Sequence, residues 1–358
     1  MSAPKVITVA VTGLNATDSP APGVPVIRAI RDAFGDRVRI VGLAYDTLDP
    51  GNFLPGLADH VYIMPYPSQG SEVLITRLLA IHDEVAIDVL IPTLDAELPS
   101  IIKAVDRLHE AGIRTFLPDE DMLRLRDKVR LHELDAKFGI RVPKGVVISD
   151  PADIARLDQE LEFPVMVKGQ FYEAYIAYSP MDVHAHFEKL RAKWGVPIIV
   201  QRYVPGEEYD VVLVGDGEGG LVGSVAMRKM QLTDKGKAWG GVTISDAKLD
   251  QYVRHAVAAL KWRGPCEMEV MKSASGYHLI EINPRFPAWV YLSVGARRNL
   301  PAAVVRLALG EAVEAMPPAS PGVMFLRYAY DQICDMEEYA ALTTVGQLHR
   351  DRSEGDPS

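Results

Sequence analysis

Short apolar runs alternate with amphipathic segments over the first third of the chain. Val6–Val11, Val38–Ala44 and Val89–Pro92 are apolar enough to be buried strands, and Ser71–His82 repeats apolar residues at helical spacing. Apolar strands separated by helices are typical of a parallel, doubly wound sheet. Residues 1–118 are therefore predicted to form an α/β domain of this kind.

The pattern changes after this first domain. Residues 119–200 open with a charged helical segment and continue with short strands. Residues 201–332 contain longer alternating segments with hairpin spacing, which favour an antiparallel α+β arrangement. The composition turns polar over residues 333–358, which are predicted to be a C-terminal tail with a frayed end.

One β-hairpin is predicted to carry the chemistry. Two alternating segments within residues 266–282 are separated by a polar, turn-rich spacer. Because side chains alternate along a strand, Glu267 and Glu269 share one face, and Glu281 and Asn283 share one face. Antiparallel pairing can make these faces coincide. The result is either a metal site built from hard oxygen ligands or a solvated acidic face.

Composition narrows the class of protein. The chain has 358 residues, enough for two or three domains, and a formal charge of −10, which argues against nucleic acid or an anionic membrane as partner. Cys266 and Cys334 give no disulfide framework and no metal-binding spacing. No run approaches the roughly 20 apolar residues of a membrane span. A cytoplasmic location is expected.

The hairpin residues resemble a known signature. Glu269 is followed twelve positions later by Glu281, and then by Asn283 and Arg285. This spacing resembles the metal and phosphate signature of the ATP-grasp superfamily. Known members include biotin carboxylase, the large chain of carbamoyl-phosphate synthetase and D-alanine–D-alanine ligase. The resemblance implies that Glu269, Glu281 and Asn283 hold two Mg²⁺ ions, or Mn²⁺, on the phosphates of ATP.

The resemblance also assigns domains and ATP contacts. It implies a pre-ATP-grasp domain over the doubly wound sheet, then an ATP-grasp fold of two subdomains. Two lysines would reach the phosphates, Gln201 and the adjacent backbone would read adenine, and a carboxylate would hold ribose. The residues implied for ATP are Lys128, Lys168, Gln201, Tyr203, Val204 and Glu208.

Catalytic and substrate residues follow from the same resemblance. Arg285 belongs to the phosphate and acyl-phosphate site, Lys168 stabilises charge during transfer, and Arg228 is chosen from a basic, glycine-containing loop as an acyl-phosphate clamp. Acceptor contacts are expected from loops at the carboxyl ends of the first strands and from two aromatic positions. These substrate residues are Asn15, Asp95, Glu97, Tyr172 and Trp289. The loop residues could equally be helix caps.

The expected activity is that of an ADP-forming carboxylate–amine ligase. Its substrates would be a small carboxylate and an amine or a peptide, and a homodimer is one state that the resemblance allows. One departure is the glycine-poor segment 170–177, where many relatives carry a glycine-rich loop over the phosphates. Three alternatives stay open: a bicarbonate-using, carbamoyl-phosphate-like enzyme, a nucleotide-binding module without turnover, and a NAD(P)-dependent protein that uses the N-terminal sheet. The absence of a GxGxxG fingerprint disfavours the last of these.

Overall fold

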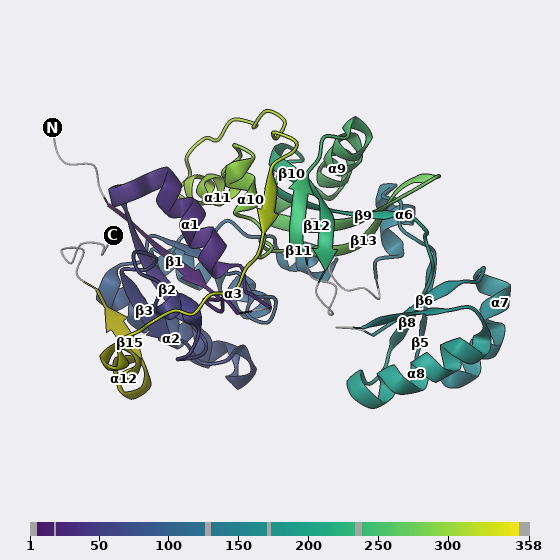
Figure 1. Cartoon of the computed structure of the whole chain (residues 1–358), viewed down its shortest axis with the longest axis horizontal. Helices are drawn as coiled ribbons and strands as arrows, with labels where there is room; N and C mark the ends of the chain where they lie inside the picture. The colour runs from purple at the N-terminus through teal and green to yellow at the C-terminus, as the bar shows by residue number, and fades with distance from the viewer. Residues whose placement is uncertain (1–5, 18, 126–129, 170–172, 233–237, 351–358) are drawn as a thin grey trace.

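Three β-sheets lie in a row along the long axis of the molecule (Figure 1). The computed structural model describes residues 6–17, 19–125, 130–169, 173–232 and 238–350. The predicted fold class, a parallel α/β unit followed by antiparallel α+β units, is confirmed. No helix among the described ranges is both long and apolar enough to cross a membrane.

The first sheet is the predicted parallel one. Its strand order is β15-β3-β2-β1-β4. Strands β1 to β4 run parallel because each connection returns the chain to the same end of the sheet. The parallel strands are β1 (Ile7–Thr12), β2 (Val38–Ala44), β3 (His60–Ile63) and β4 (Val89–Ile91). The helices are α1 (Gly23–Phe34), α2 (Ser71–Val85), α3 (Leu98–Lys103) and α4 (Val105–Ala111).

The C-terminal segment differs from the predicted polar tail. It contains helix α12 (Met336–Thr344) and strand β15 (Gln347–His349), and β15 pairs antiparallel with β3 at the edge of the first sheet. Leu342 is buried in the core of that domain. The sparse apolar residues are separated by polar ones, which hid the element in the sequence. The final eight positions, 351–358, lie outside the described residues.

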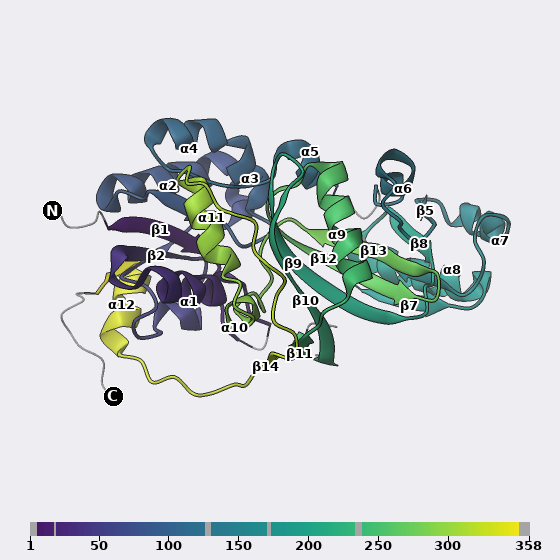
Figure 2. The ribbon, with the colours of Figure 1, turned by 90° about the horizontal axis from the view of Figure 1, so that it is seen from above.

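A small sheet at the opposite end of the molecule has the order β5-β8-β6-β7 (Figure 2). Its strands are β5 (Gly145–Ile148), β6 (Val165–Lys168), β7 (Ala174–Ala177) and β8 (Ile198–Arg202). Helices α7 (Leu157–Glu160) and α8 (Pro180–Trp194) belong to this unit. The charged segment before it, predicted as one helix, contains α5 (Glu120–Arg124) and α6 (Glu133–Phe138).

The central sheet is antiparallel, with the order β13-β12-β9-β10-β11-β14. Its strands are β9 (Glu207–Asp216), β10 (Leu221–Leu232), β11 (Ala238–Thr243), β12 (Arg263–Ser273), β13 (Gly276–Asn283) and β14 (Met324–Leu326). Helices α9 (Ala247–Leu260), α10 (Leu292–Gly295) and α11 (Leu300–Ala308) accompany it. Strand β10 extends to residue 232 and contains Arg228, which was predicted to lie in a basic loop.

The central sheet uses its two faces differently. Val211 and Leu213 pack in one core with α9, whereas Val212 and Val214 pack in a second core that also contains residues of α1 and α11. That second core continues into the first domain, so the parallel sheet and the central sheet share apolar side chains. This shared packing fixes the first domain against the face that carries the predicted metal ligands.

Candidate metal and nucleotide site

The pairing of β12 with β13 brings the predicted metal ligands together. Glu269 lies opposite Glu281, and Glu267 lies opposite Asn283. Directly paired residues of antiparallel strands point to the same face, so the predicted coincidence of the two acidic faces is what the register produces. Strand β9 pairs on the other side of β12 and places Asp210 opposite Glu269.

Asn283 is oriented by two of these carboxylates. Its Nδ2 donates to Glu267 Oε2 at 3.1 Å and to Glu269 Oε1 at 3.3 Å. Because the amide nitrogen faces the carboxylates, the amide oxygen is the atom available for a cation, as the predicted role of Asn283 requires.

Glu267 is a buried anchor that the prediction did not assign to the site. It is 6% exposed, and Trp289 Nε1 donates to its Oε1 at 2.6 Å. Arg285 Nη1 lies 3.5 Å from its Oε2. Burial and the neighbouring Glu269 raise the pKa of Glu267. The side chain therefore ties together Trp289, Asn283 and Arg285.

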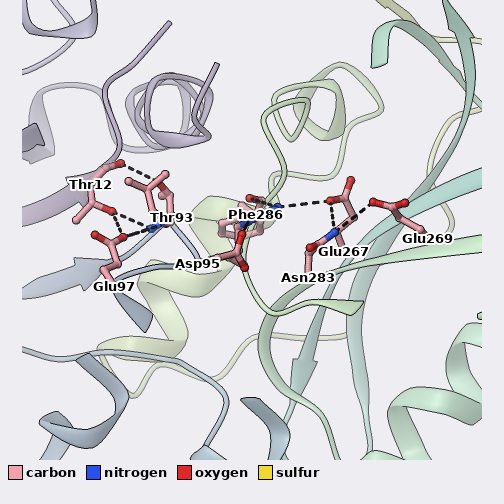
Figure 3. A network of polar contacts seen from close by, with 10 residues as sticks. Thr12, Thr93, Asp95, Glu97, Glu267, Glu269, Asn283 and Phe286 are labelled. Carbon is pink, nitrogen blue, oxygen red and sulfur yellow. Dashed lines mark hydrogen bonds and ion pairs between the residues drawn. The ribbon is translucent and has the colours of Figure 1, made fainter. Parts of the chain in front are cut away.

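Arg285 connects the central sheet to the first domain. Its Nε donates to Asp95 Oδ2 at 3.0 Å, across 190 positions of sequence. Figure 3 shows Asp95 between two groups, with Thr12, Thr93 and Glu97 on one side and Glu267, Asn283 and Glu269 on the other. The predicted phosphate residue and a predicted substrate loop are thus in direct contact.

These side chains line a cavity of about 1100 Å³ between the first domain and the central sheet. The residues that line it include the three predicted metal ligands, Glu269, Glu281 and Asn283, together with Arg285 and Glu208. Of the predicted substrate residues, Asn15, Asp95 and Trp289 also line it. The cavity therefore joins the predicted metal site to loops at the carboxyl ends of β1 and β4.

Glu97 occupies a different position from the one expected of a substrate contact. It is fully buried and accepts hydrogen bonds from Thr12 Oγ1, Tyr45 OH and the backbone N–H groups of Thr93 and Leu94. Burial raises the pKa of Glu97. Because four donors already contact its two oxygens, the Glu97 carboxylate holds the loop that carries Asp95 and does not reach the cavity.

The predicted adenine-side residues lie on the small sheet. Lys168 Nζ donates to Gln201 Oε1 at 2.9 Å, and Gln201 Nε2 donates to the Pro143 carbonyl oxygen at 3.3 Å. The Tyr203 N–H donates to the Pro164 carbonyl oxygen, so a purine contact from this residue would use its carbonyl group. Val204 is half-buried in the segment that joins β8 to β9.

Lys229, rather than the predicted Arg228, faces the cavity from β10. Lys229 lies level with Glu208 on the paired strand, whereas Arg228 pairs with Tyr209 and is exposed. The period of two along a strand places neighbours on opposite faces, and only the observed register shows which one points inward. The predicted contacts Lys128 and Tyr172 lie outside the described residues.

Asp210 and Arg327 are two further cavity residues that the sequence did not reveal. Asp210 is 2% exposed. Arg327 donates to the carbonyl oxygens of Ala238 at 3.1 Å and Ala288 at 3.3 Å, and it forms no ion pair with a carboxylate of the described residues. Alternation along β9 marks Asp210 as a neighbour of Glu208, whereas Arg327 follows the short β14 and gave no local signal.

The donor set fits a hard divalent cation. The cavity face of the central sheet carries five carboxylates, from Glu208, Asp210, Glu267, Glu269 and Glu281, and the oxygen of Asn283. Carboxylate and amide oxygens are the ligands that Mg²⁺ and Mn²⁺ take in proteins. Asp210 Oδ1 is buried and has no hydrogen-bond partner among the described residues, which is typical of a group that binds a cation or a donor.

Comparison with known families shows which proteins the chain resembles. Residues 195–329 match the model of a family described as ATP-grasp in the biosynthetic pathway with Ter operon. The carbamoyl phosphate synthase large chain of Clostridium beijerinckii is 26% identical over 199 residues, which are 51% of this chain and 18% of that protein. The chain thus spans about a fifth of the length of the curated relatives that it matches.

Solved structures extend the likeness to the whole fold. A biotin carboxylase from Campylobacter jejuni, in complex with β,γ-ATP, has a TM-score of 0.68 at 14% identity, covering 90% of this chain and 75% of that one. An L-amino acid ligase from Bacillus licheniformis has a TM-score of 0.65 at 14% identity, covering 85% and 75%. The resemblance to the ATP-grasp superfamily is confirmed at the level of the fold.

The Trp289–Glu267 hydrogen bond can be measured against a matched tryptophan. Trp289→Phe removes the donor to a buried carboxylate, whereas Trp262→Phe removes a buried indole N–H that has no partner among the described residues. We expect Trp289→Phe to lower the free energy of unfolding by about 1.5–3 kcal/mol more than Trp262→Phe, the range for hydrogen bonds to charged groups. Urea unfolding monitored by circular dichroism measures both; equal losses would contradict an energetic role for this bond.

The buried Glu97 predicts a pH dependence of stability. A carboxyl whose folded pKa is raised binds a proton in the folded state that the unfolded chain has released, so stability falls as the pH rises above about 4.5 towards the folded pKa. The slope from one such group reaches about 1.4 kcal/mol per pH unit. Glu97→Gln should remove this slope, whereas Glu218→Gln at an exposed turn should keep it. Unfolding midpoints from pH 4 to 8 test this, and parallel profiles for wild type and Glu97→Gln would refute it.

Proposed function

We propose that this chain, which has the ATP-grasp fold, is a Mg²⁺- and ATP-dependent ligase that joins a carboxylate to an amine through an acyl phosphate. The observation that carries the proposal is the convergence of Glu269, Glu281 and Asn283 on the cavity face of one sheet, with Arg285 beside them. The likeness to carbamoyl phosphate synthase and to an L-amino acid ligase supports the same class of reaction.

In this proposal the nucleotide lies between the small sheet and the central sheet. Gln201 and the backbone of Tyr203 and Val204 bind the base, and Lys168 binds phosphate together with Lys128. Glu208 accepts the ribose hydroxyls. The Lys168–Gln201 hydrogen bond places the proposed phosphate and adenine contacts on adjacent strands, which supports this arrangement.

Glu269, Glu281 and Asn283 would hold two Mg²⁺ ions. When bound, Mg²⁺ draws negative charge from the phosphates and neutralises the charge that develops during phosphoryl transfer. The chain itself would position the reacting groups. Glu267 fixes Asn283 and Arg285 through the contacts described above, so the ligand oxygen and the guanidinium are oriented before substrates arrive.

The reaction divides into two balanced steps. A carboxylate oxygen of the substrate attacks the γ-phosphorus and ADP leaves, which gives the acyl phosphate. The amine nitrogen then attacks the acyl carbon, phosphate leaves and the amine loses a proton. Arg285 would stabilise the transferring group through its guanidinium. The products are ADP, phosphate and an amide.

Arg327 is proposed as the clamp for the substrate carboxylate or its acyl phosphate. It lines the cavity and its described partners are backbone carbonyl oxygens, so its charge is compensated by no carboxylate at ion-pair distance. Burial lowers the pKa of Arg327. An anion beside a desolvated guanidinium would be bound strongly. This role replaces the one predicted for the exposed Arg228.

The acceptor end of the cavity would lie at the first domain. Asn15 and Asp95 extend from the loops after β1 and β4 and are the proposed acceptor contacts. Trp289 contributes its indole to the cavity wall and its N–H to Glu267. The boundaries of the proposed domains remain 1–118, 119–200 and 201–332, with the C-terminal strand returning to the first.

The test is ADP formation from Mg²⁺ and ATP against pooled amino acids and small carboxylates. Glu281→Ala removes a ligand from the centre of the metal site and should reduce ADP formation on the order of 100-fold or more, as losses of single transition-state contacts do. Glu218→Ala, at an exposed turn of the same sheet, is the matched control and should retain wild-type turnover. Circular dichroism confirms that both variants are folded.

Other outcomes would assign the site differently. Most of the turnover surviving in Glu281→Ala would refute the metal assignment. ADP release that depends on bicarbonate and needs no amine would indicate the carboxylase class. A rise in melting temperature with ATP but no ADP would indicate a binding module.

A further inference from the structure

A second group of carboxylates lies beside the proposed magnesium ligands. Glu208 and Asp210 on β9 and Glu269 on β12 each offer an oxygen, and these three oxygens lie within 4.8 Å of one another. Oxygens that bind one cation at 2.3–2.6 Å are separated by at most about 5 Å. The spacing is therefore that of ligands around a single cation.

An ammonium group occupies this cluster. Lys229 Nζ, from β10, contacts Glu208 Oε1 and lies 3.2 Å from Asp210 Oδ2. The lysine side chain is 11% exposed, so its charge is largely removed from water. Although burial opposes it, the Asp210, Glu269 and Glu208 carboxylates raise the pKa of Lys229, which keeps the group charged.

The ammonium satisfies the cluster incompletely. Asp210 is 2% exposed and lines the cavity, yet within the part of the chain that the structure describes its Oδ1 has no hydrogen-bond partner. A buried carboxylate oxygen without a donor is costly, on the order of 1–3 kcal/mol or more for a charged group. The position therefore has capacity for a cation that could contact more than the two oxygens reached by Lys229.

We propose that Lys229 is a built-in monocation that occupies a cation-binding position formed by Glu208, Asp210 and Glu269. The position is separate from the hairpin site, because two of its ligands come from β9 and only Glu269 is shared. By holding Glu208 and Asp210, the ammonium keeps them from competing with Glu269, Glu281 and Asn283 for divalent metal. The contacts of Lys229 carry this assignment, the competing hairpin site rests on the proposed function, and the cation position can be measured without ligase activity.

Removing the ammonium should create a divalent-cation site. Lys229→Met keeps most of the length of the side chain and removes its charge, so three carboxylates face one another without the ammonium. We expect this variant to bind one more Mn²⁺ per chain than the wild type at about 1 mM metal, in the range of weaker all-oxygen sites. Free Mn²⁺ is counted by electron paramagnetic resonance without nucleotide, so the result is independent of the ADP assay.

Two variants control for an unspecific gain in the number of bound Mn²⁺ ions. Lys229→Met with Asp210→Asn should lose the additional ion, because one of its ligands becomes an amide. Lys272→Met removes a lysine that is paired with Asp246 at 2.8 Å elsewhere on the sheet, and it should bind the same number of ions as the wild type. An extra ion in the Lys272 variant would show that any lost lysine has this effect and would overturn the proposal.

Folding of the variant gives a second measurement. Without the ammonium, repulsion between the carboxylates should lower the melting temperature of Lys229→Met, and Mn²⁺ should raise it by more than it raises that of the wild type. A folded Lys229→Met with the wild-type number of ions overturns the proposal. So does an unfolded one that Mn²⁺ does not refold.

Discussion

The pairing register of β9, β12 and β13 is the constraint on which the site depends. Side chains in a sheet alternate between faces, so a slip of one residue in either pairing would turn Asp210 or Glu281 away from Glu269. The register is held by the apolar residues on the opposite face, where β9 and β12 pack against α9. Hydrophobic packing on one side of the sheet thus sets the positions of the ligands on the other.

Gathering five carboxylates on one face has an electrostatic cost that the chain offsets in several ways. Lys229 neutralises the β9 end, and Arg285 with Trp289 supports the buried Glu267. Glu269 and Glu281 add two further carboxylates to the cavity lining beside these compensated groups. Removing one partner of such a group leaves an uncompensated buried charge, so these contacts are strongly interdependent. The gathering of carboxylates on this face is also what favours a divalent cation in the cavity.

Much of the fold and the centre of the site could be predicted because their signals are local. Alternating apolar strands indicated the parallel sheet, and Glu269, Glu281 and Asn283 belong to one hairpin whose geometry follows from its spacing. Lys229 was missed in favour of Arg228 because only the pairing of β10 with β9 distinguishes their faces. Arg327 lies far along the chain from Ala238 and Ala288, which it contacts. Glu97 has the sequence position of a helix cap, and only the structure shows that four donors surround its carboxylate. Contacts between distant segments leave no periodic trace in a sequence.

The contact between the first domain and the central sheet brings these distant residues into one connected network. Glu97, buried beneath the loop after β4, holds Thr93 and Leu94 by their backbone N–H groups. That loop carries Asp95, which binds Arg285 beside the proposed metal ligands. A substrate that displaced Asp95 would therefore remove a negative charge from beside Arg285 and release its guanidinium from this ion pair. In the proposed ligase, occupancy of the acceptor end would be coupled to the phosphate end through one ion pair, and the shared apolar core keeps the two domains close enough for that pair to form.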